Sequence, residues 1–384
     1  MNAFTKEDLK RFQAESLHDK VQRLLAKISE WFSYWNNEVY VAFSGGKDSS
    51  VLADLCAFWC SCIGATLYLC FVNTGLEYPE IQKHVKDFAE YLRQKYKIEV
   101  VLDILRPQMR FDEVIKTYGY PMIGKRQANA ISLARKNFED GVYTLRLALL
   151  GMTVEEAKAM GLRLPSSELL DRYAKRTDKS KFNIPKYRKL LDVDFKVSDL
   201  CCDVMKKEPA HKYEKETGRK AILATMTDES TLREKNWLQH GCNAFNSKRQ
   251  QSAPMSFWTE QDVLQYIKKY EIPIASVYGE VEYANDPDQL RFEDLGIECE
   301  GCEELHLTGC HRTGCVFCGF GCHLEESPSR FERLKITHPR QYEYCIGGGE
   351  YNEDGIWQPN KQGLGMGHVF EVLNQIYGEG FIKY

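Results

Sequence analysis

The feature that most constrains the fold is the stretch Val39–Leu55, which reads VYVAFSGGKDSSVLADL. The apolar run from Val39 to Phe43 predicts a buried strand, and it ends at a Ser-Gly-Gly turn. Helical spacing of apolar residues then begins with Val51, Leu52 and Leu55. Glycine lets a backbone approach a ligand closely, and the free N–H groups at the start of a helix attract anions. The stretch therefore predicts a strand, a phosphate-binding turn and a helix.

The polar residues of this turn suit phosphate chemistry. Lys47 adds a positive charge for phosphate, and we expect its side chain to be exposed at the loop. Asp48 is suited to hold Mg²⁺ at a leaving pyrophosphate, and equally suited to complement the dipole of the helix that follows. Ser49 and Ser50 are expected to cap this helix and to donate to phosphate. Neither the Walker spacing nor a G-x-G-x-x-G pattern is present, so a different phosphate loop is indicated.

Strand and helix patterns alternate around this loop. Further strands are expected at 65–73, 98–102 and 221–225, with helices between them. Such alternation predicts an α/β fold with a doubly wound, mostly parallel sheet and a ligand at the carboxyl ends of its strands. The amphipathic segment 6–36 is expected to form a leading helix beside the sheet.

The length of 384 residues allows a large core, and we expect five segments along the chain. They are an N-terminal helical segment (1–36), a nucleotide-binding half (37–125), a helical insertion (126–195), the second half of the α/β domain (196–284) and a cysteine-rich, metal-binding region (285–384).

Charge and hydropathy narrow the class of protein. The net charge of −4 gives no global basic field that would indicate nucleic-acid binding. No apolar run approaches the roughly eighteen residues of a membrane span, and the polar N-terminal segment lacks a signal-peptide core. We therefore expect a cytoplasmic protein that does not enter the membrane.

The fourteen cysteines fall into different groups. In a reducing compartment, clustered cysteines indicate metal ligands or catalytic thiols rather than disulfides. Four cysteines lie among apolar residues and are expected to be buried, namely Cys56, Cys60, Cys62 and Cys70. A second group of six lies within 298–323, and an adjacent pair precedes it at Cys201 and Cys202.

Two metal sites compete for the second group of cysteines. A four-thiolate iron–sulfur site would use Cys201, Cys202, Cys315 and Cys318. A four-sulfur zinc site would use Cys299, Cys302, Cys315 and Cys318. Packing does not explain so many cysteines in a short hydrophilic stretch, so a metal of one kind or the other is expected.

Three motifs resemble those of a known family. Ser44–Ser49 resembles the PP-loop of the N-type ATP pyrophosphatases. The stretch 71–80, FVNTGLEYPE, resembles the second-strand signature of the phosphoadenosine phosphosulfate (PAPS) reductase family of PP-loop proteins. Glu229, Ser230 and Arg233 resemble the ES-x-x-R element of that family. The resemblance spans residues 20–345, roughly.

This resemblance implies a fold of the adenine nucleotide alpha-hydrolase type. It implies catalytic roles for Lys47 and Asp48. It also implies an adenine-nucleotide site that comprises Ser44, Gly45, Gly46, Lys47, Asp48, Ser49, Ser50, Asn73, Thr74, Glu229, Ser230 and Arg233. The 4Fe–4S ligand set of the adenylylsulfate-reductase branch resembles four cysteines of this chain, namely Cys201, Cys202, Cys315 and Cys318. Cys299 and Cys302 then remain for a separate Zn²⁺.

The chain departs from the family's reductases in one respect. They carry a C-terminal Glu-Cys-Gly-x-His segment, whereas no cysteine follows Cys345 in this sequence. The chain is more similar to the iron–sulfur ATP-pyrophosphatase and sulfurtransferase branch, such as the DNA phosphorothioation component. That branch implies Mg²⁺-dependent adenylylation of an acceptor by ATP, release of pyrophosphate and then sulfur insertion. The implied partners are a sulfur donor such as a cysteine desulfurase and a nucleic-acid acceptor, and the oligomeric state stays open.

Basic residues in and before the insertion are candidates to contact an anionic substrate. They are Lys125, Arg126, Lys186 and Arg188, for which a solvated charged surface is the alternative. Two other functions also stay open. One is a phosphoadenylyl- or adenylyl-sulfate reductase that uses Cys345 or Cys322 as its nucleophile, and the other is a non-catalytic subunit that binds nucleotide and metal.

Overall fold

The computed structural model describes residues 3–179, 184–284 and 304–384. The chain divides into two units, each discontinuous in sequence. The first contains Met1–Arg106 and Pro209–Gly314, and the second contains Pro107–Glu208 and Cys315–Tyr384. These boundaries lie inside the segments expected from the sequence rather than between them.

A five-stranded sheet forms the centre of the first unit, and all of its strand pairs are parallel. Its strands are β1 (Val39–Ala42), β2 (Leu67–Val72), β3 (Val100–Leu105), β5 (Lys220–Ile222) and β6 (Gln251–Ser252). Their order in the sheet is β3-β2-β1-β5-β6, so the chain reverses its direction of winding between β1 and β5. Ligands bind at such a switch point in open α/β sheets. The predicted doubly wound parallel sheet is confirmed.

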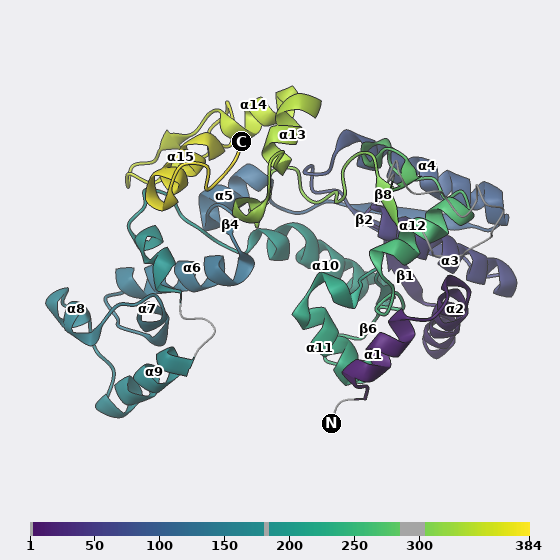
Figure 1. Ribbon diagram of the computed structural model, residues 1–384, viewed down its shortest axis with the longest axis horizontal. Helices are drawn as coiled ribbons and strands as arrows, with labels where there is room; N and C mark the ends of the chain where they lie inside the picture. Colours follow the sequence, from purple (N-terminus) through teal and green to yellow (C-terminus); the bar gives the residue numbers. More distant parts are fainter. Residues whose placement is uncertain (1–2, 180–183, 285–303) are drawn as a thin grey trace. The chain divides into compact units, whose positions relative to one another are not determined.

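Helices cover this sheet (Figure 1). They are α1 (Lys6–Gln13), α2 (Leu17–Tyr34), α3 (Lys47–Ile63), α4 (Pro79–Tyr96), α10 (Glu208–Thr217), α11 (Thr231–His240) and α12 (Glu260–Lys269). The core between helices and sheet includes Trp31 of α2, Val41 of β1 and Leu52 of α3, none of them accessible to solvent. Among the described residues, no helix is both long enough and apolar enough to cross a membrane.

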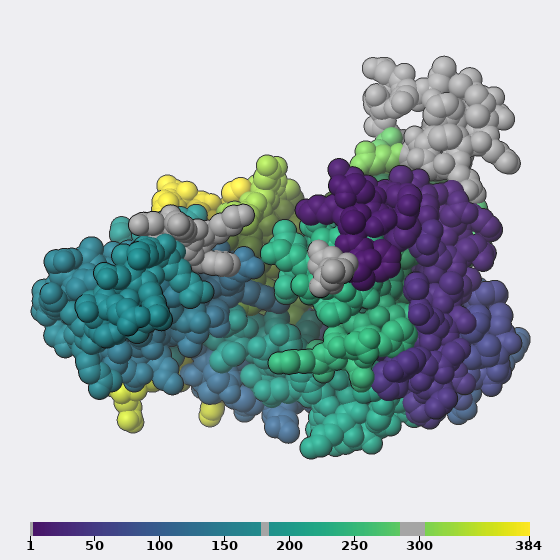
Figure 2. All heavy atoms as spheres, turned by 90° about the horizontal axis from the view of Figure 1, so that it is seen from below, coloured from purple at the N-terminus to yellow at the C-terminus, as the bar shows by residue number. Residues whose placement is uncertain are grey.

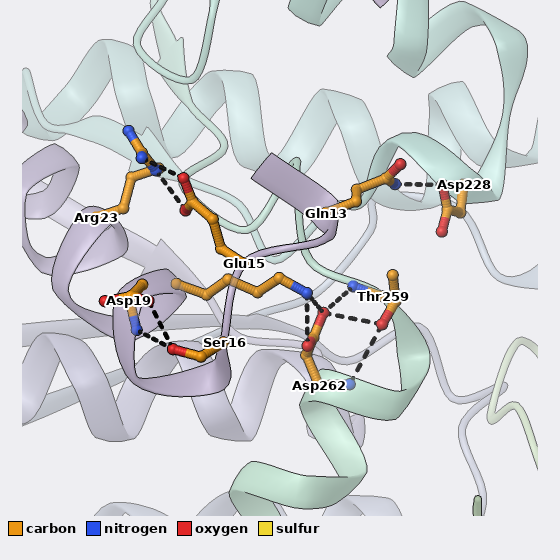
Figure 3. A network of polar contacts seen from close by, with 9 residues as sticks. Gln13, Glu15, Ser16, Asp19, Arg23, Asp228, Thr259 and Asp262 are labelled. Carbon is orange, nitrogen blue, oxygen red and sulfur yellow. Dashed lines mark hydrogen bonds and ion pairs between the residues drawn. The ribbon is translucent and has the colours of Figure 1, made fainter. Parts of the chain in front are cut away.

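The N-terminal amphipathic segment forms two helices, so the prediction of a single leading helix is wrong. The break falls before Ser16, whose hydroxyl caps α2 by accepting a hydrogen bond from the backbone N–H of Asp19 at 3.2 Å (Figure 3). A hydroxyl that competes in this way for a backbone N–H favours a new helix start over a continuous helix. Behind this turn, the buried Lys20 ammonium lies 2.7 Å from the carboxylate of Asp262 on α12.

Asp262 serves a second purpose at the start of α12. Its carboxylate accepts a hydrogen bond from the backbone N–H of Thr259, the N-cap residue, at 2.7 Å (Figure 3). The side chain of Gln13 likewise donates to Asp228 at 2.8 Å. In Figure 2 the purple N-terminal helices lie beside the green segment that carries these partners. Polar contacts thus join the two sequence segments of the first unit.

The second unit is mostly helical. Its helices are α5 (Phe111–Tyr118), α6 (Lys125–Glu139), α7 (Leu145–Leu149), α8 (Val154–Ala159), α9 (Ser167–Lys179), α13 (Arg330–Thr337), α14 (Pro339–Ile346) and α15 (Met366–Tyr377). Two short parallel strands, β4 (Met122–Ile123) and β9 (Gly319–Phe320), pair with each other. A small antiparallel pair joins β10 (Glu350–Tyr351) to β11 (Trp357–Gln358). The core of this unit includes Phe195, Phe331 and Phe370.

The four cysteines expected to be buried behave differently from one another. Cys56, Cys60 and Cys70 are buried in the first unit, as predicted. Cys62 is exposed, so its predicted burial is wrong. It lies in the last turn of α3, where Ser61 and Ile63 are also exposed.

Candidate functional site

The phosphate loop connects β1 to α3 at the switch point of the sheet. Gly46 is the N-cap of α3, and no side chain caps it. Gly45 has a φ of +72°, and a Cβ atom at this position would lie 2.7 Å from a methyl group of Val85 on α4. Only glycine meets both conditions without strain. The predicted sequence of strand, glycine turn and helix is confirmed.

The serine hydroxyls of the loop lie close to one another, to a backbone carbonyl or to a buried histidine. The Ser44 hydroxyl lies 3.1 Å from that of Ser49, which donates to the Gly46 carbonyl at 2.8 Å. The Ser50 hydroxyl is buried against Nε2 of His84, 2.9 Å away. Because Gly46 is the N-cap, the prediction that Ser49 and Ser50 cap the helix is wrong. Ser50 faces α4 rather than the loop.

Lys47 is 4% exposed, so the prediction of an exposed side chain is wrong. Its ammonium lies 3.3 Å from Asp48 Oδ1 and 3.1 Å from Oε1 of Glu260, the first residue of α12. Burial opposes the charge on Lys47, but the two carboxylates outweigh it and raise the pKa of the ammonium. Lys47 is therefore held as a cation beside the loop.

A tyrosine that no sequence motif indicated contacts the phosphate loop. Tyr278 ends the short 3₁₀ helix η4 (Ser276–Tyr278) and is 2% exposed. Its hydroxyl accepts a hydrogen bond from the backbone N–H of Lys47 at 3.2 Å and lies 2.5 Å from the hydroxyl of Thr313. Tyr278, Thr313 and Glu260 are all far from the loop in sequence, so no local pattern could have identified them.

The turn after β2 holds the predicted residues Asn73 and Thr74. Asn73 Oδ1 accepts a hydrogen bond from the backbone N–H of Gly75 at 3.0 Å. The Thr74 hydroxyl donates to the Glu77 carboxylate at 2.7 Å. These bonds fix the turn at the carboxyl edge of the sheet, where the phosphate loop also lies because β1 and β2 are parallel neighbours.

The turn after β5 holds Glu229, Ser230 and Arg233. Ser230 is the N-cap of α11 and accepts a hydrogen bond from the backbone N–H of Arg233 at 3.3 Å. Glu229 forms an ion pair with the Arg233 guanidinium. Burial lowers the pKa of Arg233, and so does the positive charge of Arg312, whereas Asp48 raises it. Arg312 thus lies near Arg233, and Arg233 lies near Asp48 of the loop.

Asp48 meets the requirement for a cation ligand. Its Oδ1 atom is buried and has no hydrogen-bond partner among the described residues, although it contacts the Lys47 ammonium. A buried carboxylate oxygen without a hydrogen bond is a suitable ligand for Mg²⁺. Asp48 also lies in the first turn of α3, where its charge complements the helix dipole. The two roles predicted for this residue are therefore compatible.

The four cysteines of the predicted iron–sulfur set all lie in the second unit. The sulfurs of Cys201 and Cys202 are 4.0 Å apart, and the backbone N–H of Cys318 donates to the Cys315 carbonyl at 3.1 Å. The pKa of Cys201 is raised first by the hydrogen bond that its thiol donates to Cys202, then by burial and by the nearby sulfurs of Cys318 and Cys315. The fold therefore brings together cysteines that are more than a hundred residues apart.

Lys125 lies against these thiols. The hydrogen bond from Cys201 lowers the pKa of Cys202 to about 5, with a further contribution from the Lys125 ammonium. This ammonium also lies 5.9 Å from the centre of the Phe320 ring. Burial lowers the pKa of the Lys125 ammonium, but the Cys202 sulfur outweighs this effect and raises it.

The other basic candidates from the sequence have different environments. The Arg188 guanidinium donates to the Gly151 carbonyl at 3.1 Å and pairs with Glu156 at 3.0 Å, which gives it a structural role. Lys186 lies 4.8 Å from the ring centre of its neighbour Tyr187. Arg126 is exposed on α6. All three residues belong to the second unit, whereas the phosphate loop belongs to the first.

The described part of the chain contains no group of three or more His, Cys, Asp or Glu side chains placed to hold a metal ion. Cys299 and Cys302, required for the zinc alternative, lie outside the described residues. The iron–sulfur ligand set of Cys201, Cys202, Cys315 and Cys318 therefore stays a prediction.

The two cysteines considered as reductase nucleophiles are both buried. Cys345 has no accessible surface, and Cys322 is 1% exposed and donates to the Gly319 carbonyl at 3.0 Å. Burial raises the pKa of Cys345 well above its usual value and that of Cys322 to about 12. Neither thiol is a nucleophile in this conformation, because attack requires an accessible thiolate.

Comparison with known proteins places this geometry in context. The model of the family described as "Phosphoadenosine phosphosulfate reductase domain" matches residues 38–163 and 122–319, well over half of the chain. An uncharacterized protein of Methanocaldococcus jannaschii is 34% identical over 136 residues, which cover 33% of this chain. The matched part is only 26% of that relative's length.

Proposed function

Since the chain belongs to the phosphoadenosine phosphosulfate reductase domain family, we propose that it is a PP-loop enzyme that cleaves ATP to AMP and pyrophosphate and transfers sulfur to an acceptor. Family membership supports a nucleotide-binding enzyme. The choice of ATP and of sulfur transfer follows the similarity to the iron–sulfur pyrophosphatase branch.

One observation carries the nucleotide part of this proposal. The loop 44–49 lies at the switch point of a parallel sheet, with a glycine at positive φ and the start of α3 directed toward the ligand position. Backbone N–H groups at a helix start and a buried ammonium favour a polyphosphate. The guanidinium of Arg233, which is paired with Glu229, lies near Asp48 of the same loop.

The residues of the loop have separate parts in the reaction. Lys47 neutralises the negative charge that grows on the leaving pyrophosphate, and Asp48 holds the Mg²⁺ that accompanies ATP. An oxygen of the acceptor attacks the α phosphorus, the bond between this phosphorus and the bridging oxygen to the β phosphate breaks, and pyrophosphate leaves. AMP remains on the acceptor until a sulfur nucleophile from the donor displaces it.

We propose that Cys201, Cys202, Cys315 and Cys318 hold a 4Fe–4S cluster. When bound, such a cluster supplies electrons or a site for sulfide in the sulfur-transfer step. The 4.0 Å separation of the Cys201 and Cys202 sulfurs supports this assignment, as does the Lys125 charge beside Cys202, since a nearby cation favours a thiolate. A zinc site at Cys299 and Cys302 stays a separate expectation.

The two other functions are less well supported. A sulfonucleotide reductase would need an accessible cysteine nucleophile, whereas Cys322 and Cys345 are buried. Sulfite released from adenylyl sulfate or its 3′-phosphate would nevertheless reveal this activity. A non-catalytic subunit would bind nucleotide without forming products.

Product analysis tests the proposed reaction. ATP labelled in its α phosphate is expected to give labelled AMP and unlabelled pyrophosphate, because the proposed cleavage falls between the α and β phosphates. The assay includes sulfide and candidate acceptors, since turnover depends on both, and Lys47→Ala is the inactive control. Release of ADP and phosphate would contradict the proposed function and place the protein in another class of enzyme.

A further inference from the structure

The phosphate loop is already occupied by groups of the protein itself. The hydroxyl of Tyr278 accepts the hydrogen bond of the Lys47 backbone N–H, one of the first donors of α3. The Glu260 carboxylate contacts the Lys47 ammonium at 3.1 Å. Both donors are groups that a nucleotide phosphate would bind. A hydroxyl and a carboxylate oxygen therefore stand where phosphate oxygens are expected.

The position of Tyr278 is fixed by a second segment of the same unit. The backbone N–H of Gly309 donates to the Tyr278 carbonyl at 2.9 Å, and that of Cys310 donates to the Val277 carbonyl at 2.9 Å. A Cβ atom at Gly309 would lie 2.5 Å from the Val277 carbonyl oxygen, so only glycine allows this approach. The segment then places the Thr313 hydroxyl 2.5 Å from that of Tyr278.

The contact with the loop is close. A Cβ atom at Gly46 would lie 3.2 Å from the Tyr278 hydroxyl oxygen. A phosphate oxygen that accepted the hydrogen bond of the Lys47 N–H would need the position of the Tyr278 hydroxyl, so both cannot use this N–H in the observed arrangement. The nucleotide must displace Tyr278 or bind elsewhere.

We propose that the hydroxyls of Tyr278 and Thr313 form a latch that occupies the phosphate loop in the absence of nucleotide and is displaced when nucleotide phosphate binds. This inference rests on the proposed nucleotide site. The latch satisfies the Lys47 N–H while the site is empty, and nucleotide binding exchanges one acceptor for another. Opening the latch costs free energy. The apparent affinity for nucleotide is therefore lower than it would be without the latch.

Removal of the Tyr278 hydroxyl is therefore expected to tighten nucleotide binding. In Tyr278→Phe the ring stays in place, but the Lys47 N–H lacks an acceptor until a phosphate arrives. The loss of one neutral hydrogen bond predicts that the dissociation constant for α,β-methylene-ATP with Mg²⁺ falls by roughly threefold to tenfold. Calorimetric titration of the full-length protein with this non-cleavable nucleotide measures the change.

Two further variants make the test specific. Thr313→Val removes the second hydroxyl of the latch and is expected to tighten binding in the same direction. Tyr270→Phe removes the hydroxyl of an exposed tyrosine of the first unit and is expected to leave the dissociation constant unchanged. Damage to the fold would weaken binding, so a tightened dissociation constant reports the latch rather than general destabilisation.

The outcomes separate this inference from the proposed function. Equal or weaker binding by Tyr278→Phe and Thr313→Val, with Lys47→Ala still impaired, would overturn the latch and leave the nucleotide site standing. If Tyr278→Phe does not fold, the Thr313→Val result alone decides. Absence of nucleotide binding by every variant and by the unmodified protein would contradict both.

Discussion

Replacement of Lys47 by alanine is expected to weaken ATP binding by roughly tenfold to a hundredfold, because a charge-assisted contact with phosphate contributes about 1.5–3 kcal/mol. Two acidic neighbours of Lys47 are expected to add to this loss. Without the ammonium, the carboxylates of Asp48 and Glu260 would remain beside the loop and repel the phosphates. Calorimetric titration with ATP measures the effect.

A matched control keeps this result specific to the loop. Lys10→Ala removes an exposed lysine of the same unit, on α1, and is expected to leave ATP affinity unchanged. Circular dichroism should show that both variants remain folded. An unchanged ATP affinity in Lys47→Ala would contradict the assignment of 44–49 as a phosphate loop.

The double substitution Cys201→Ser, Cys202→Ser is expected to abolish the proposed iron–sulfur cluster, and this is the largest spectroscopic change that we expect. Two of four thiolate ligands would be lost, and serine oxygen is a poor replacement for sulfur at iron. Protein purified without oxygen should be brown, and the double variant should be colourless and lack iron by elemental analysis.

Cys62→Ser is the control for this experiment, because Cys62 is exposed on α3 and belongs to the other unit. It should retain both colour and iron. A colourless, zinc-containing protein whose metal content does not respond to the double substitution would defeat the cluster and favour the alternative that uses Cys299 and Cys302.

The sheet and the phosphate loop could be predicted because their signals are local. The apolar run before Ser44 and the helical spacing after Ser50 lie within one short stretch, and the alternation of patterns indicates a parallel sheet. The position of the loop at the switch point then follows from the topology of such sheets.

The environment of Lys47 could not be predicted in the same way. Its burial depends on Glu260 and Tyr278, which approach from segments more than two hundred residues away. The division of the N-terminal segment into α1 and α2 was missed for a different reason. Apolar spacing continues across the break, and the signal was instead the capping hydroxyl of Ser16.

The cysteines proposed as cluster ligands include one feature that local sequence signals indicated and one that they did not. The adjacent pair Cys201–Cys202 and the spacing of Cys315 and Cys318 indicated a shared site, and the fold does bring their sulfurs near one another. No sequence pattern indicated that Lys125 lies beside them, because a basic residue at the start of a helix is usually part of a solvated charged surface.

The proposed role of the backbone N–H groups of 44–49 and of the Lys47 ammonium is to bind nucleotide phosphates. A crystal structure with α,β-methylene-ATP and Mg²⁺ tests it most directly, since this nucleotide cannot be cleaved between its α and β phosphates and needs no acceptor. We predict phosphate oxygens within hydrogen-bond distance of the Lys47 backbone N–H and ammonium, with the Tyr278 hydroxyl moved away. Nucleotide bound elsewhere, with the Tyr278 hydroxyl still on the Lys47 N–H, would contradict the account.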